Sequence, residues 1–345
     1  MSDKTSSLLG TLKALCMVSI IFVALMSIWL ISENTQDIET VAEQSETTAE
    51  VTTTVAETTT EQSLLTFADK QFHITDIHKG ALCLVNNENK YYDEGEDHKR
   101  ICVSDYKNNY YYVTDRSIVL KLPVMDSLNN MFLDFYSATG NNDVIITSGY
   151  RSIEEQSQLY SAELKEKSAS KSNLVARPEY SENHTGYAMD LAVYPEWSKR
   201  ISGEGSYSWI MQNCYKYGWV LRYPTGKEDI TGMVAQPWHF RYVGYPHSQI
   251  MRKYGYTLEE YINYLRNFSY GEGHLKFTDE HSAEYEIYYV PVNMNELAPV
   301  IPVPDNREYD ISGNNIDGFI VTAYLTQSID SKPNNVFEDD KTVKK

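Results

Sequence analysis

The chain has 345 residues, of which 42% are hydrophobic, and a formal net charge of −18. This length suits one good-sized domain with appendages or two small domains, and the composition is that of a globular protein. The acidic balance argues against nucleic acid as a partner, because binding to phosphates requires a basic surface.

The N-terminal part contains a candidate membrane segment. Residues 14–32 read ALCMVSIIFVALMSIWLIS and carry no charged side chain; roughly 20 apolar residues span a bilayer as a helix. Lys4 and Lys13 precede the segment and an acidic stretch follows it, which predicts a cytoplasmic tail at residues 1–13 and an extracytoplasmic remainder. A cleaved signal peptide is the alternative. No small-residue cleavage site follows, so we predict an uncleaved, single-pass anchor in the cell membrane.

The next segment, residues 33–64, is rich in Thr and Glu and contains neither Lys nor Arg. A segment of this composition cannot bury a core, and its charges repel one another. It is therefore predicted to be a disordered stalk that holds the rest of the chain away from the membrane.

Short alternating runs such as ALCLVN and YYYVTD follow over residues 65–122. They predict the strands of a small leading β subdomain. Pro123 then opens a run with apolar residues at helical spacing, and Gly140 is predicted to end this helix.

The middle region, residues 123–268, is predicted to have an α+β fold with helices packed on a short, mainly antiparallel sheet. Two capping boxes, Ser152 with Glu155 and Thr257 with Glu260, predict two helix starts. The segments DVIITS, YAMDLAVY, WVLRYP and WHFRYVG predict the strands of the sheet.

The C-terminal part is rich in strand-forming segments. AEYEIYYVPV and YDISGNNIDGFIVTAYL, with a Gly-Asn-Asn turn, predict a small β module over residues 269–330. Residues 331–345 are expected to form a loose tail. His247 and His281 are expected at the surface.

The cysteines leave two alternatives open. Cys16 lies in the predicted anchor, so Cys83, Cys102 and Cys214 would be outside the cell, where a disulfide can persist. Cys83 and Cys102 flank a predicted hairpin and could pair. Three separate buried thiols are the alternative, and no CxxC pair indicates a cysteine zinc site.

Three polar segments of the middle region, SGYRSIEEQ, YSENHTGYAMD and QPWHFRYVG, contain candidate metal ligands. Asp190 lies inside an apolar run, where an unpaired charge would be costly. Asp190 and His239 would both project from strands, and strand-borne ligands are held rigidly. A lone histidine in a strand is more often a core residue, but the three segments together favour a site.

In these segments the chain resembles the VanY-like D-alanyl-D-alanine carboxypeptidases, zinc peptidases that trim the terminal D-alanine from peptidoglycan stem peptides. The resemblance covers about residues 123–255 and rests on SGYRS, GKEDITG and PWHFRYVG in this order. It implies the fold of these enzymes and of the Hedgehog-like zinc peptidases. It also implies a zinc ion held by His, Asp and His with a water molecule, and a Glu that takes the water's proton.

The family pattern around the first ligands is S-x-H-x-x-G-x-A-x-D, and the second pattern is E-x-x-H. The residues that match are Ser181, Gly186, Ala188 and Asp190 in the first pattern and His239 in the second.

The resemblance also implies a substrate-binding group. Arg151 and Gln156 match the positions that, with Ser181, hold the terminal carboxylate of the substrate. Arginine suits this task because its planar fork meets a carboxylate through two hydrogen bonds. These three residues are named the carboxylate clamp below.

Two positions depart from the patterns. Asn183 stands at the first zinc histidine, with His184 one residue later, and Gln236 stands at the catalytic Glu. A glutamine cannot be a general base, and general acid–base catalysis contributes roughly 10²–10⁴ in rate. Asp190 and His239 alone leave a catalytic zinc one ligand short. His184 would complete the metal site only if the turn shifted by one residue.

Three functions follow as alternatives. We favour a non-catalytic module, anchored outside the cell, that binds peptidoglycan stem peptides. An active zinc D,D-carboxypeptidase is the second, and it needs His184 as a ligand. A structural cell-wall protein that binds neither zinc nor peptide is the third.

Overall fold

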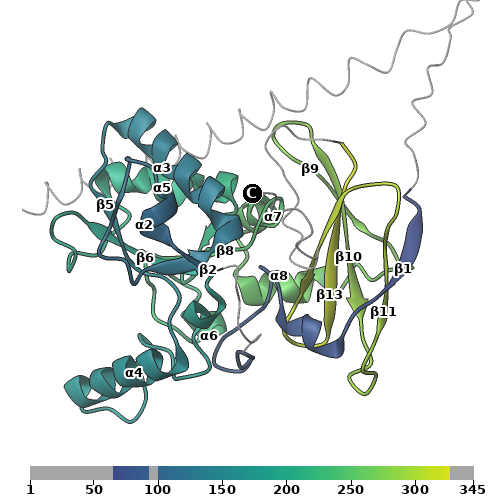
Figure 1. Cartoon of the computed structure of the whole chain (residues 1–345), viewed down its shortest axis with the longest axis horizontal. Coiled ribbons are helices and arrows are strands. Elements are labelled where there is room, and N and C mark those ends of the chain that lie inside the picture. The colour runs from purple at the N-terminus through teal and green to yellow at the C-terminus, as the bar shows by residue number, and fades with distance from the viewer. Residues whose placement is uncertain (1–64, 93–99, 327–345) are drawn as a thin grey trace, which may run out of the picture. The chain divides into compact units, whose positions relative to one another are not determined.

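A five-stranded sheet in the order β3-β5-β6-β8-β7 carries the segments singled out above (Figure 1). Its strands are β3 (Tyr112–Val113), β5 (Val144–Ser148), β6 (Ala188–Val193), β7 (Trp219–Leu221) and β8 (His239–Tyr242). β3 and β5 are parallel and the other neighbours are antiparallel, which confirms the predicted α+β class. This computed structural model describes residues 65–92 and 100–326, so the predicted cytoplasmic tail, anchor and stalk and the C-terminal tail lie outside the described residues.

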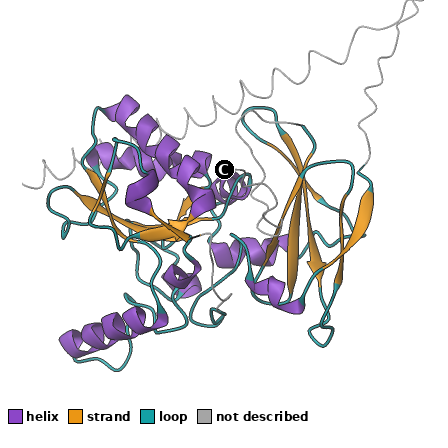
Figure 2. Cartoon of the chain, viewed as in Figure 1, coloured by secondary structure: helices purple, strands orange, loops and turns teal. Residues whose placement is uncertain are grey.

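Helices lie on both sides of this sheet, with α3 and α5 on one side and α4 and α6 on the other (Figures 1 and 2). The helices are α2 (Val103–Tyr106), α3 (Met125–Thr139), α4 (Ile153–Lys167), α5 (Ser208–Asn213), α6 (Glu228–Thr231), α7 (His247–Tyr254) and α8 (Leu258–Leu265). Gly140, at a φ of 70°, ends α3 as predicted. Both predicted capping boxes are present, at the starts of α4 and α8.

One face of the five-stranded sheet packs on α3. Leu128 and Phe132 of the helix share a buried core with Met189, Leu191 and Phe240 of the strands. Because successive side chains of a strand point to opposite faces, the residues between them in sequence face away from α3. The sheet thus separates a hydrophobic core from a second, polar face.

The C-terminal part contains a second sheet in the order β12-β13-β10-β9. Its strands are β9 (Leu275–Thr278), β10 (Glu284–Pro291), β12 (Tyr309–Gly313) and β13 (Gly318–Tyr324), and β11 (Val300–Pro304) lies outside it. Phe319 and Val321 of β13 pack against residues of β11 and against Phe72 and Ile77. Ile320 lies between them and packs with residues of α7 and α8. This alternation makes the sheet a layer that is buried on both faces.

The strands of residues 65–122, predicted as a leading β subdomain, pair partly with each other and partly with strands outside this segment. β1 (Phe67–Gln71) pairs with β11, and β3 joins the five-stranded sheet. β2 (Arg100–Cys102) pairs with β4 (Val119–Lys121). Strand edges need partners; β1 and β3 find them in strands that follow later in the chain, whereas β2 and β4 pair with each other.

The run ALCLVN, predicted as a strand, is irregular over residues 81–86. Its apolar side chains are buried, as predicted, but its backbone bonds to side chains and turns instead of to a strand. The amide of Leu82 donates to Oγ of Ser312 at 3.0 Å, and that of Leu84 donates to the carbonyl of Asn314 at 3.2 Å. The predicted hairpin between Cys83 and Cys102 is therefore wrong.

The described cysteines are thiols in separate places, and no disulfide joins Cys83 to Cys102. The Cys83 thiol donates to the carbonyl of Gly313 at 3.4 Å, whereas the Cys102 sulfur lies 3.1 Å from the carbonyl of Arg116. Of the two alternatives, the structure has the separate thiols, of which Cys83 and Cys214 are buried and Cys102 is half-buried.

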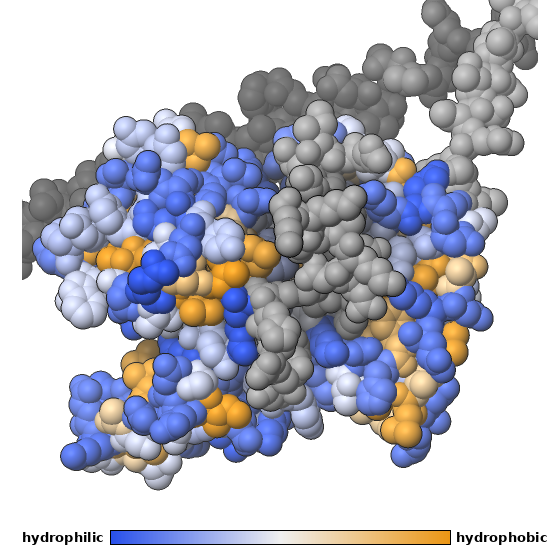
Figure 3. All heavy atoms as spheres, in the orientation of Figure 1, coloured by the Kyte–Doolittle hydropathy of each residue, from blue (hydrophilic) through white to orange (hydrophobic). Residues whose placement is uncertain are grey.

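The part of the chain that the structure describes belongs to one compact unit, which begins at Ser63. Among residues 65–92 and 100–326, no helix is long and apolar enough to cross a membrane. On the face drawn in Figure 3, hydrophilic residues predominate and the hydrophobic ones form small, separate patches.

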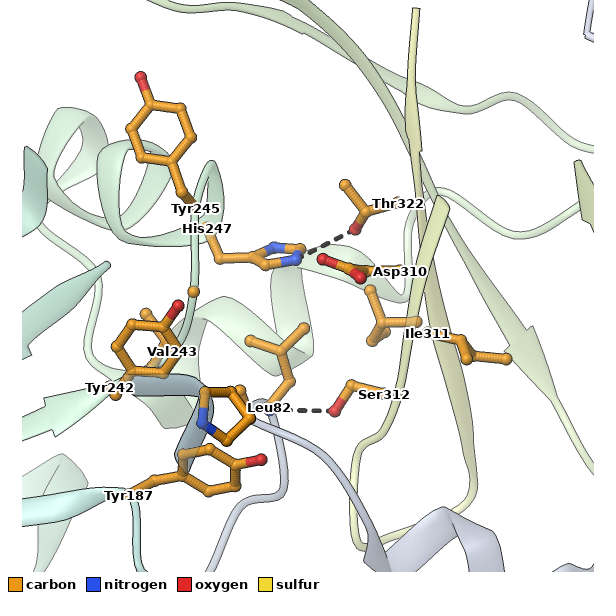
Figure 4. Close-up of a pocket in the computed structure, with 14 residues that line it drawn as sticks. Leu82, Tyr187, Tyr242, Val243, Tyr245, His247, Asp310, Ile311, Ser312 and Thr322 are labelled. Carbon is orange, nitrogen blue, oxygen red and sulfur yellow. Dashed lines mark hydrogen bonds between the residues drawn. The ribbon is translucent and has the colours of Figure 1, made fainter. Parts of the chain in front are cut away.

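His247 lies in a pocket between α7 and the C-terminal sheet, not at the surface as predicted (Figure 4). Its Nδ1 is 2.8 Å from the hydroxyl of Tyr261, and its Nε2 is 3.0 Å from Oγ1 of Thr322. Burial lowers the pKa of His247 to about 3. The neutral ring, with one donor and one acceptor nitrogen, therefore joins the helix to the sheet.

Because His247 is buried in its neutral form, we expect the free energy of unfolding to fall in acid. The pKa of His247 in the folded chain is about 3, below its ordinary value of 6.5, so the unfolded chain binds the extra proton between these values. The free energy of unfolding should fall by about 1.4 kcal/mol for each pH unit of acidification in this window. His247→Gln keeps a donor and an acceptor but lacks the titrating ring. In denaturant titrations between pH 6 and 4, its free energy of unfolding should fall by about 1.4 kcal/mol less per pH unit than that of the natural chain. His281→Gln is the control, because the His281 side chain is 64% exposed. Equal slopes in the natural chain and His247→Gln would contradict the assignment.

Candidate active site

Asp190 and His239 are partners across neighbouring strands. The antiparallel register of β6 and β8 places Asp190 opposite His239, and that of β5 and β6 places Ser148 opposite Asp190. Met189 and Phe240, their neighbours in sequence, belong to the core beneath α3. Asp190 and His239 therefore lie on the polar face of the sheet, as the two strand segments predicted.

The imidazole of His239 lies between two carboxylates. Its Nδ1 is 2.6 Å from Oδ1 of Asp190, and its Nε2 is 2.9 Å from Oε1 of Glu182. The Tyr223 ring stacks on it, with ring centroids 5.1 Å apart. Burial lowers the pKa of His239, but the contacts with Asp190 and Glu182 outweigh burial and raise it. A charged imidazolium that donates from both nitrogens fits this position.

Glu182 is the centre of a buried ion-pair network and is only 1% exposed. Its Oε2 accepts from Nε of Arg222 at 2.7 Å and from Nη1 of Arg241 at 3.3 Å. Arg222 also forms a two-pronged pair with Glu259, at 2.6 and 2.9 Å. Burial raises the pKa of Glu182, but the two arginines and His239 outweigh burial and bring it to about 2. The network fixes His239 from the side opposite Asp190.

The other oxygen of Asp190, Oδ2, receives two guanidinium groups. Nη2 of Arg151 lies 3.2 Å from it and Nη1 of Arg200 lies 3.0 Å from it. Burial raises the pKa of Asp190, but His239 and these arginines hold it well below its usual range. Among the described residues, the ion pairs around Asp190 and Glu182 join four arginines to three carboxylates. The site therefore favours an anion over a cation, in a chain that is acidic as a whole.

The structure brings two members of the carboxylate clamp together. Nη1 of Arg151 donates to Oε1 of Gln156 at 2.8 Å, and its Nε and Nη2 lie 3.0 and 2.8 Å from Oγ of Ser148. Gln156 is fully buried, and its amide donates to the carbonyl of Ala176 at 2.6 Å. Both ends of that amide are engaged, so Gln156 is a positioning residue for Arg151. The hydroxyl of Ser181, the third member, donates to Oδ1 of Asn183 at 3.3 Å.

The short 3₁₀ helix η3 (Glu182–Thr185) directs both candidate ligand side chains of the turn to the backbone. Nδ2 of Asn183 donates to the carbonyl of Gly149 at 2.8 Å. Nε2 of His184 accepts from the amide of Glu179 at 3.2 Å, so its Nδ1 donates to the carbonyl of Arg151, 2.7 Å away. His184 then has no lone pair available for a metal, and this position does not support its predicted role as a ligand.

Gln236, at the position of the general base in the family pattern, also bonds to the backbone. Its side-chain Nε2 donates to the carbonyl of Leu174 at 3.2 Å, and its backbone N–H donates to the carbonyl of Tyr223 at 2.9 Å. An ionised glutamate has no donor for the Leu174 carbonyl. The glutamine therefore matches its surroundings as a hydrogen-bond donor, a role that a glutamate could not perform.

Comparison with known proteins now identifies the family. The family described as VanY: D-alanyl-D-alanine carboxypeptidase matches residues 118–245. A D-alanyl-D-alanine carboxypeptidase of Enterococcus faecium is 36% identical over 250 residues, which cover 72% of this chain and 76% of that protein. The chain belongs to the VanY family. The predicted resemblance is thereby confirmed, and the similarity extends beyond the residues from which it was inferred.

A solved structure supports the VanY fold. The D,D-dipeptidase VanXYg in complex with a D-Ala-D-Ala phosphinate analogue has a TM-score of 0.67 to this chain and is 33% identical to it. The match covers 75% of this chain and 99% of that one. The mixed α+β fold with small sheets is therefore that of the VanY and VanXY peptidases.

Members of the VanY family are zinc-dependent peptidases. If Asp190 and His239 held zinc in this chain, the distance between their ligand atoms would match that of a zinc site. In a tetrahedral site with zinc at 2.0–2.2 Å, two ligand atoms lie about 3.4 Å apart. Oδ1 of Asp190 and Nδ1 of His239 are 2.6 Å apart, which is a hydrogen-bond distance. Within residues 65–92 and 100–326, no group of three His, Cys, Asp or Glu side chains could hold a metal ion. The residues present in this VanY chain do not fit the zinc ion.

Several residues of the site were not found from the sequence. They are Glu182, Arg200, Arg222 and Arg241. Arg241 follows His239 by two positions in a strand, a spacing that places both on one face. The other three offered no such local signal, because their partners lie far along the chain.

Proposed function

We propose that this VanY chain binds peptidoglycan stem peptides that end in D-Ala-D-Ala and does not hydrolyse them. The observation that carries the proposal is the direct 2.6 Å contact between Asp190 and His239. It joins the two remaining candidate ligands to each other, while Asn183 and His184 bond to the backbone. The arrangement keeps a cationic site and lacks a base.

In this proposal the terminal carboxylate of the peptide binds to the carboxylate clamp. The guanidinium of Arg151 is held in place by Ser148 and Gln156 and is partly exposed, so little side-chain freedom is lost on binding. Gln236 can donate or accept a hydrogen bond but cannot take a proton from water at neutral pH. Binding without release of D-alanine is the consequence.

The chain's place in the cell is part of the same proposal. The uncharged residues 14–32 would anchor it in the cell membrane, and the Thr- and Glu-rich residues 33–64 would carry the binding part outward. Lysines before the apolar segment support this orientation. Fractionation of cells that express the full-length chain, with and without residues 14–32, tests the anchor, and recovery of both chains in the soluble fraction would refute it.

Hydrolysis is the second candidate function. It is favoured by the name and 36% identity of the Enterococcus faecium relative, a D-alanyl-D-alanine carboxypeptidase. It would need a base other than Gln236 and a third metal ligand from a rearranged turn. D-alanine release by the natural chain in zinc would support it.

The proposal predicts binding without turnover. A pentapeptide ending in D-Ala-D-Ala should bind the full-length chain in isothermal titration, while no D-alanine is released with or without added zinc. Arg151→Gln should weaken binding by about ten- to a hundredfold, because it removes charge-assisted hydrogen bonds. Arg116→Gln is the matched control, since Arg116 also pairs with a carboxylate, Asp105, but its side chain is 75% exposed. Absence of any peptide binding by the natural chain would refute the proposal.

A further inference from the structure

Arg200 is a candidate ligand-binding residue that the family patterns do not include. Its backbone forms a bridge with Ala192, antiparallel to β6. Ala192 follows Asp190 by two positions, so both lie on the same face of the strand. This placement brings the Arg200 guanidinium to Asp190, with Nη1 at 3.0 Å from Oδ2.

One side of the Arg200 guanidinium is held and the other is open. The Trp238 ring centroid lies 5.4 Å from its central carbon, within the range of a cation–π contact. The Arg200 side chain nevertheless remains 43% exposed, compared with 20% for Arg151. Its Nε and Nη2 make no hydrogen bond with another described residue, so donors remain for a ligand.

Two guanidinium groups on one carboxylate oxygen leave a positive charge, which Glu155 near Arg151 offsets only in part. Arg151 and Arg200 both contact Oδ2 of Asp190, and His239 takes Oδ1. Because like charges this close repel each other, an additional anion between or beside them would be stabilised. A free carboxylate at a peptide C-terminus has the required charge and planar shape.

We propose that Arg200 and Arg151, both held by Asp190, form a metal-independent receptor for the terminal carboxylate of the stem peptide. The inference rests on the proposed function and adds a second binding residue to it. Asp190 then orients two arginines in place of binding a metal. Arg200 reaches the ligand from the exposed side, and Arg151 reaches it from the clamp.

The test compares two peptides on three forms of the full-length chain. The peptides are a D-Ala-D-Ala-ended pentapeptide with a free C-terminus and the same peptide as its C-terminal amide. The chains are the natural one, Arg200→Gln and the control Arg116→Gln, each titrated in EDTA and in zinc. Arg200→Gln should weaken binding of the free acid about tenfold or more and leave the amide unaffected. EDTA should change neither affinity. Arg200→Lys, which keeps the charge but loses the fork, should fall between the natural chain and Arg200→Gln.

The outcomes separate the inference from the function on which it rests. Equal affinity of Arg200→Gln and the natural chain for the free acid would overturn the inference and leave peptide binding standing. Loss of binding in EDTA would likewise overturn it, because a metal would then be required. If the natural chain bound neither peptide, the proposed function would fail and the inference with it.

Discussion

A variant that carries both Asn183→His and Gln236→Glu is expected to release D-alanine from a D-Ala-D-Ala-ended pentapeptide in zinc, whereas the natural chain is not. The rate should exceed that of the natural chain by at least about 100-fold, the lower end of what general acid–base catalysis contributes. Histidine at 183 adds the third side chain that Asp190 and His239 lack for a catalytic zinc. Glutamate at 236 adds a group that can take a proton. An assay of free D-alanine over time measures the gain.

The single variants are the first controls for this gain. Asn183→His alone lacks the base, and Gln236→Glu alone lacks the ligand, so each should remain near the natural chain. The matched pair Asn267→His with Gln212→Glu makes the same chemical changes at exposed positions and should have no effect. If the double variant binds peptide but stays inactive, the proposed lack of activity in the natural chain would involve more than these two side chains.

The structure indicates that both substitutions require a local rearrangement of the backbone contacts around them. Gln236 donates to the carbonyl of Leu174, and Asn183 donates to that of Gly149. Glutamate at 236 would face the Leu174 carbonyl without a proton, so its side chain should leave that position. Equal D-alanine release by the natural chain and the double variant would instead favour the active-enzyme alternative.

Local signals in the sequence predicted most of the elements around the site. The capping boxes at Ser152 and Thr257 and the glycine after α3 act within a few residues, so they are readable without a partner. The segments that carry Asp190 and His239 were each predicted as strands, and the structure shows that these strands pair. The sequence therefore predicted four of the five strands of this sheet and the two central site residues, whereas β3 was assigned to the leading subdomain.

The parts that were not predicted depend on contacts over long sequence distances. Residues 81–86 are apolar like a strand, but their backbone bonds to Ser312 and Asn314. Arg200 and Glu182 lie in segments whose composition fits a surface loop. Only the folded chain shows that each meets its charge partner, because an ion pair has no sequence periodicity.

Removal of the buried carboxylate of Glu182 should destabilise the fold, because its charge partners would stay buried. Glu182→Gln is expected to lower the free energy of unfolding by about 3–5 kcal/mol at pH 7, the usual cost of removing one partner of a buried ion pair. The substitution keeps the shape of the side chain but leaves Arg241 without a carboxylate, while Arg222 keeps Glu259. Denaturant unfolding followed by tryptophan fluorescence measures the difference. Asp105→Asn, which breaks the exposed pair with Arg116, should cost at most about 1 kcal/mol.

The same variant carries a pH signature that a mere packing defect would lack. The pKa of Glu182 is about 2 in the folded chain and has an ordinary value of 4.5, so its ionised form stabilises the fold above pH 4.5. That stabilisation is lost progressively as the pH falls from 4.5 towards 2, by about 1.4 kcal/mol for each unit. The natural chain should therefore lose its advantage over Glu182→Gln across this window and keep it undiminished between pH 5 and 7. A difference between the two chains that stayed constant down to pH 3 would mean that shape, not charge, accounts for the loss. The side chains of the ion-pair network would then stabilise the fold only by packing behind His239.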